Sequence, residues 1–80
     1  MADMNEQKRL QYARMLNWRI AALSLHLGSQ CPQEIRQDTK RAAIWVRDQL
    51  RTILAKKETT SLRNEIQSCE EIIEFYERNP

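Results

Sequence analysis

The sequence predicts an all-α protein, and three observations support this class. The 80-residue chain contains one glycine and two prolines, so it offers few places for turns. Its apolar residues recur at spacings of three and four, which is the period of one helix face. No run of β-branched and aromatic residues alternates with polar residues in the way that strands require. We therefore expect a single domain, residues 1–80, folded as an antiparallel helical hairpin or three-helix bundle that dimerisation could complete.

The first predicted helix covers about residues 5–27 and carries two apolar rows. One row consists of Tyr12, Ala13, Leu16, Ile20, Leu23 and Leu27. The other, called here the second apolar row, lies beside it and consists of Met15, Trp18, Ala22 and Leu25. At about 100° per residue the two rows together span roughly 220° of the helix circumference. One neighbouring helix could not cover that much apolar surface.

The second predicted helix covers about residues 32–56 and follows a loop. Gly28 suits the left-handed position just past a helix end, and Pro32 suits the first turn of the next helix. Cys31 would then occupy the N-cap of the second helix. The predicted inward face, which Trp45 flanks, consists of Ile35, Thr39, Ala42, Ala43, Val46, Leu50, Ile53 and Leu54.

The third predicted helix covers about residues 61–78. Its apolar row is out of phase with the second helix and consists of Leu62, Ile66, Cys69, Ile73 and Tyr76. A break is therefore needed near residues 58–61, where Thr59, Thr60 and Ser61 are good N-cap residues. Because no glycine or proline marks this break, a kinked continuous helix is the alternative.

Charge favours pairing of the second and third helices. Residues 29–57 carry seven basic and three acidic side chains, a net charge of +4. Residues 58–80 carry two basic and six acidic side chains, a net charge of −4. Antiparallel neighbours of opposite charge attract each other, so we expect these two helices to form a hairpin.

Composition argues against several functional classes. Cys31 and Cys69 are too few for a disulfide framework and lack the spacing of a metal site, so we expect reduced thiols and no metal or cofactor. One bond between them would need their helices to lie side by side. The N-terminal residues are polar, which argues against a signal peptide, and the apolar-rich run at 20–27 is too short to span a membrane. We expect a soluble cytoplasmic protein.

The second apolar row is the main candidate site, with two interpretations. It could pack against the third helix of the same chain, or it could be exposed as a dimer seam or partner-binding face. Tryptophan and methionine are enriched at such faces. The candidate protein-binding residues are Met15, Trp18, Ala22, Leu25 and Trp45. They predict a non-enzymatic adaptor, chaperone or inhibitor that binds a larger protein and forms a homodimer. The short chain is also typical of phage or mobile-element accessory proteins.

A basic row on the second helix gives an alternative, a nucleic-acid-binding regulator. The row consists of Arg36, Lys40, Arg47 and Arg51. Such a row could bind phosphates, or it could be a solvated face paired with acidic residues of the third helix. The overall charge of +2 is low for a nucleic-acid-binding protein. Helices of about 23 and 25 residues are also too long for a helix-turn-helix motif.

Catalytic signals are weak. His26 is the only histidine and has no carboxylate beside it in the sequence. A reactive thiolate at Cys31 would depend on its predicted N-cap position. No glycine-rich phosphate loop or nucleophile motif occurs, so we expect no enzymatic activity.

Overall fold

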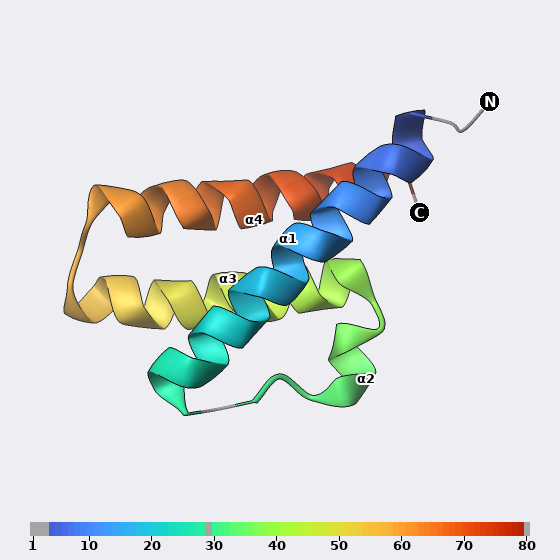
Figure 1. Cartoon of the computed structure of the whole chain (residues 1–80). Coiled ribbons are helices and arrows are strands. Elements are labelled where there is room, and N and C mark those ends of the chain that lie inside the picture. The colour runs from blue at the N-terminus through green and yellow to red at the C-terminus, as the bar shows by residue number, and fades with distance from the viewer. Residues whose placement is uncertain (1–3, 29, 80) are drawn as a thin grey trace.

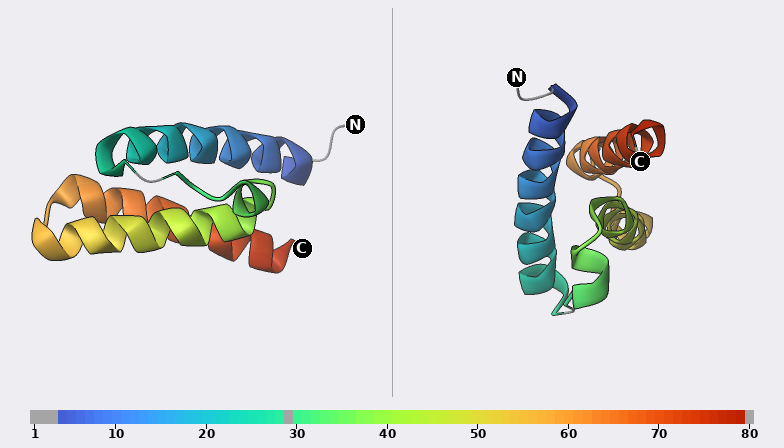
Figure 2. Two further views of the ribbon diagram at one scale, coloured as in Figure 1. Left: turned by 90° about the horizontal axis from the view of Figure 1, so that it is seen from below. Right: turned by 90° about the vertical axis from the view of Figure 1, so that its right-hand side faces the viewer.

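The computed structural model describes residues 4–28 and 30–79, and those residues form helices joined by short loops (Figure 1). The helices are α1 (Met4–Leu27), α2 (Gln33–Arg36), α3 (Thr39–Lys56) and α4 (Thr60–Arg78). α3 and α4 lie antiparallel as a hairpin, and α1 crosses one face of that hairpin (Figure 1, Figure 2). The predicted all-α class and the predicted helical hairpin are therefore confirmed.

The single second helix predicted for residues 32–56 is wrong, because Gln37 and Asp38 separate α2 from α3. Asp38 has extended backbone angles, with φ −111° and ψ 110°. Its carboxylate accepts hydrogen bonds from the backbone N–H groups of Lys40 and Arg41, at 3.1 and 3.4 Å. Aspartate is among the best N-cap residues, so it starts a new helix at this point. The apolar period continues on both sides of Asp38, which is why the pattern alone predicted one helix.

We expect Asp38→Ala to lower the free energy of unfolding by about 1 kcal/mol, because the variant loses both capping hydrogen bonds of α3. Urea denaturation followed by circular dichroism measures this loss. Asp48→Ala is the matched control, because Asp48 is an exposed aspartate inside α3 whose side chain pairs with Arg47 and caps no helix. An equal loss of stability in the two variants would contradict the capping role.

Both predicted breaks are confirmed. Gly28 follows α1 with φ +69°, the left-handed conformation that glycine adopts without strain. Thr59 caps α4, and its hydroxyl oxygen accepts a hydrogen bond from the backbone N–H of Leu62 at 3.1 Å. The helix therefore ends at Lys56 and a new one begins at Thr60, which excludes the kinked continuous helix.

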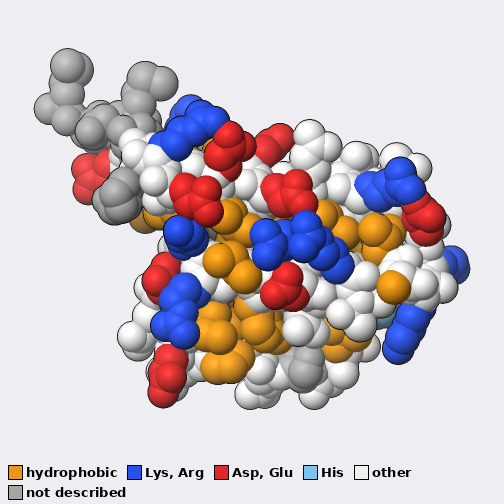
Figure 3. Space-filling model, turned by 180° about the vertical axis from the view of Figure 1, so that it is seen from behind, with side chains coloured by type: hydrophobic (Ala, Val, Ile, Leu, Met, Phe, Trp, Pro, Cys, Tyr) orange, Lys and Arg blue, Asp and Glu red, His pale blue; other side chains and the backbone are white. Residues whose placement is uncertain are grey.

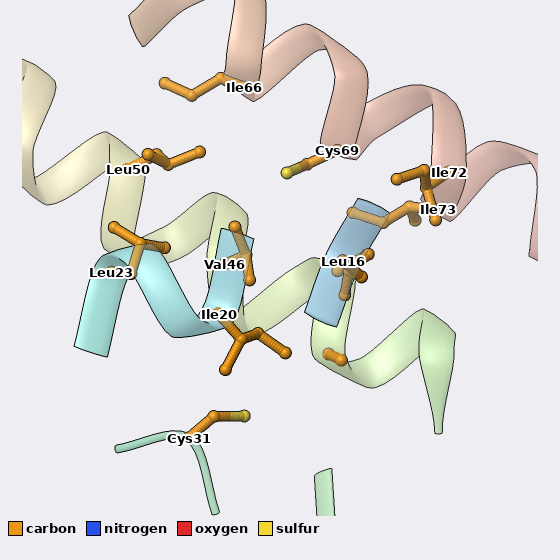
Figure 4. Packing of buried hydrophobic residues seen from close by; sticks show 12 residues of the cluster. Leu16, Ile20, Leu23, Cys31, Val46, Leu50, Ile66, Cys69, Ile72 and Ile73 are labelled. Carbon is orange, nitrogen blue, oxygen red and sulfur yellow. The ribbon is translucent and has the colours of Figure 1, made fainter. Parts of the chain in front are cut away.

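One buried cluster joins α1 to the hairpin (Figure 4). Its members are Leu16, Ile20, Leu23, Cys31, Ala42, Ala43, Val46, Leu50, Ile66, Cys69, Ile72 and Ile73. The first predicted row of α1 therefore faces the hairpin, except at its last residue. Leu27 is 40% exposed, because the C-terminal end of α1 extends beyond α3 (Figure 1).

The predicted N-cap position of Cys31 is wrong. Pro32 occupies the N-cap of α2, and Cys31 lies in the buried cluster. Burial raises the pKa of the Cys31 thiol, while the Arg36 charge opposes that shift. The protonated thiol is therefore favoured, which argues against a reactive thiolate. Both Cys31 and Cys69 are free thiols.

The N-terminal half of α1 is held against the C-terminal end of α4. The rings of Tyr12 and Phe75 meet edge to face, with their centroids 5.2 Å apart. The Tyr76 hydroxyl donates a hydrogen bond to the backbone carbonyl of Arg9 at 3.1 Å. From this contact α1 diverges from α4 and crosses α3 (Figure 1). Within the described ranges, no helix combines the length and the apolar content that crossing a bilayer requires.

Candidate protein-binding face

The second apolar row lies outside the buried cluster. Trp18 is 70% exposed, Leu25 is 90% exposed, and Met15 and Ala22 are also exposed. Packing of this row against the third helix of the same chain is therefore wrong. α1 crosses the hairpin with Leu16, Ile20 and Leu23 inward, which leaves the second apolar row outside the core.

The large exposed apolar side chains of the described residues all belong to α1: Leu10, Met15, Trp18, Leu25 and Leu27. Leu10 and Leu27 are additions to the predicted set. Leu10 precedes the second apolar row and is out of step with its spacing, so the period did not identify it. Trp45 is half-buried on α3, where it packs against the cluster. The structure therefore does not place Trp45 with the second apolar row.

A groove of about 380 Å³ adjoins the second apolar row. Trp18 and Ala22 on α1 form one wall, Leu62 on α4 forms the other, and Leu50 and Ile53 on α3 form the floor. It opens where the C-terminal half of α1 has diverged from the N-terminal half of α4 (Figure 1). An apolar groove between helices is a common binding site for the apolar face of a partner helix. Its position depends on the crossing of α1 over the hairpin, so the sequence pattern could not reveal it.

Arg19 lines the same groove and was not predicted as a site residue. Its Nε and Nη1 atoms are buried and have no hydrogen-bond partner among the described residues. Glu65 lies on the opposite wall, but the two side chains form no ion pair within 4.0 Å. Burying part of a guanidinium without a partner costs free energy. A carboxylate supplied from outside would reduce that cost.

The predicted basic row is divided between two helices and is mostly paired. Arg36 lies on α2, while the other members lie on α3. Lys40 is 3.9 Å from Glu77, and Arg51 is 3.1 Å from Glu70. Both carboxylates belong to α4.

The third member on α3, Arg47, contacts Asp48 at 3.4 Å, and Arg36 on α2 forms no ion pair among the described residues. On the face of the hairpin turned away from α1, acidic and basic side chains are interspersed (Figure 3). This arrangement is that of a solvated face paired with the third predicted helix, and it lacks the single-sign patch that phosphate binding favours.

His26 lines the groove and is exposed. Among residues 4–28 and 30–79, no three or more His, Cys, Asp or Glu side chains are grouped so that they could hold a metal ion. The candidate site is therefore an apolar groove beside an exposed apolar helix face. Comparisons with models of protein families, with curated proteins and with solved structures gave no match to this chain.

Proposed function

We propose that this chain is a non-enzymatic protein-binding module, an adaptor, chaperone or inhibitor, that binds a larger protein through the second apolar row of α1. The observation that supports this proposal is the exposure of Trp18 and Leu25, at 70% and 90%, on the outer side of a helix whose inner side is core. Gathered apolar side chains of this size are typical of interaction sites. Tryptophan is also over-represented among the residues that dominate binding energy.

The way α1 is held suits such a role. Its inner side is anchored by Leu16, Ile20 and Leu23, and its N-terminal half is fixed by the contact between Tyr12 and Phe75. A helix that is already folded and anchored loses little backbone freedom when a partner binds. More of the contact energy is then available as affinity. A homodimer would use the same face, and sedimentation of the wild type and of Trp18→Glu tests self-association.

We expect the double variant Trp18→Glu, Leu25→Glu to lose its partner in an affinity capture from nuclease-treated lysate of the source cells. Loss of one dominant apolar contact weakens binding by about 30-fold. The captured proteins are identified by mass spectrometry. The matched control is Ala55→Glu, Gln67→Glu, which adds the same charge at exposed positions of the hairpin and should keep the partner.

Circular dichroism of both double variants completes this test. A folded Trp18→Glu, Leu25→Glu protein that keeps its partner would show that binding uses another surface. An unfolded one would show that these residues are structural. Material that is captured from untreated lysate but not from nuclease-treated lysate would favour the nucleic-acid alternative. That alternative is the weaker proposal, because α4 and Asp48 already pair most of the basic row.

A further inference from the structure

We infer that the occupant of the groove and the second apolar row is an amphipathic helix of another protein whose apolar stripe is flanked by aspartate and glutamate. This inference rests on the proposed function and adds the chemical class of the partner. Three features of the described residues support it: the spacing of the row, the charge around it, and the lack of a suitable surface on a second copy.

The spacing of the row matches that of helix pairing. Met15, Trp18, Ala22 and Leu25 follow steps of three, four and three, which are the a and d positions of a heptad. Trp18 belongs both to this row and to the wall of the groove, and Met15 lines a second, shallow depression beside it. A partner helix lying along α1 would therefore cover the row and place apolar side chains in the groove.

The charged side chains that α1 itself places beside the row are basic, and Glu65 on the opposite wall is the one acidic residue among those that line the groove. No acidic residue occurs between Glu6 and Glu34, whereas Arg14 and Arg19 flank the row next to Met15 and Trp18. Arg19 also has donor atoms without a partner among the described residues. Acidic residues beside the partner's apolar stripe would be attracted by these guanidinium groups, and basic ones would be repelled.

A second copy of the chain complements this face poorly. Five of the eleven acidic residues lie on α4, whereas the exposed large apolar side chains of the described residues all lie on α1. A second copy could therefore cover the row only with its own α1. In a parallel pair of α1 helices, Arg14 would take a g position and Arg19 an e position, so like charges would face each other across the seam.

The test uses two synthetic peptides of about three heptads that share leucine at every a and d position. The acidic peptide has glutamate at e and g, and the basic peptide has lysine there, so charge repulsion keeps each peptide monomeric. Binding to the whole protein is followed by the fluorescence anisotropy of labelled peptide. We expect the acidic peptide to bind at least about tenfold more tightly than the basic one.

The contribution of the arginine charges to peptide affinity is measured with matched variants. Arg14→Gln, Arg19→Gln should weaken binding of the acidic peptide about tenfold. Arg41→Gln, Arg63→Gln removes the same charge from exposed positions of the hairpin and should leave binding unchanged. If circular dichroism shows that the Arg19 substitution unfolds the protein, Arg14→Gln alone is used, with a smaller loss of affinity expected.

Several results would overturn the inference. These are equal affinity for both peptides, no binding of either, no effect of the arginine substitutions, or displacement of the acidic peptide by single-stranded DNA of equal charge. A dimer in sedimentation experiments that Trp18→Glu dissociates would identify a second copy as the occupant. The proposed function is tested separately: it fails if the folded Trp18→Glu, Leu25→Glu variant captures the same proteins as the wild type.

Discussion

Leu16→Ala is expected to lower the free energy of unfolding by about 2 to 5 kcal/mol. Leu16 is 2% exposed and lies on the inner side of α1, in the buried cluster that joins α1 to α3 and α4 (Figure 4). Truncation removes its apolar contacts and leaves a cavity that the crossing helices fill only partly. A chain of this size has a total stability of about 4 to 12 kcal/mol, so the loss is a large share of it.

Leu25→Ala is the matched control, because it makes the same chemical change on the other side of the same helix. Leu25 is 90% exposed, and its truncation should change stability by no more than about 0.5 kcal/mol. Urea denaturation of both variants, followed by circular dichroism, gives the two values. Similar losses at the two positions would contradict the assignment of the inner and outer sides of α1, and with it the basis of the proposed binding face.

The helices could be predicted where local chemistry and apolar period agree. Gly28 follows the last residue of α1 and Thr59 is the N-cap of α4, so the bounds predicted there differ from the structure by one residue or less. The break at Asp38 could not be predicted from the period, because its cause is a hydrogen-bonded cap inside an uninterrupted apolar pattern. Tertiary context decided whether this aspartate capped a helix or lay within one.

The candidate site could be predicted only as a choice between two interpretations. The two rows of α1 have the same helical spacing, so the period does not say which row is buried. The crossing of α1 over the hairpin decides this, and it depends on contacts between distant residues, such as Tyr12 with Phe75. Arg19 and the groove depend on the same crossing. The absence of acidic residues between Glu6 and Glu34 was the available signal for a basic face.

Stability is expected to fall by roughly 2 kcal/mol between pH 9 and pH 11 because of Cys69. Burial raises the pKa of Cys69 to about 11 from its ordinary value of 9.0, with Arg19 opposing the shift and Glu65 adding to it. The unfolded chain therefore releases this proton at a lower pH than the folded protein does. The stabilisation is complete below pH 9 and is lost as the pH rises through the folded-state pKa.

Urea denaturation of the wild type and Cys69→Ala at several pH values across this window isolates the contribution. Tyrosine and lysine side chains titrate in both proteins, so their effects cancel in the difference between the two pH profiles. The variant should be less stable than the wild type near pH 8, because it loses the packing of a fully buried sulfur. It should then lose less stability on going to pH 11. Parallel profiles would mean that the folded core accommodates the thiolate as well as water does, which the burial of Cys69 between the helices argues against.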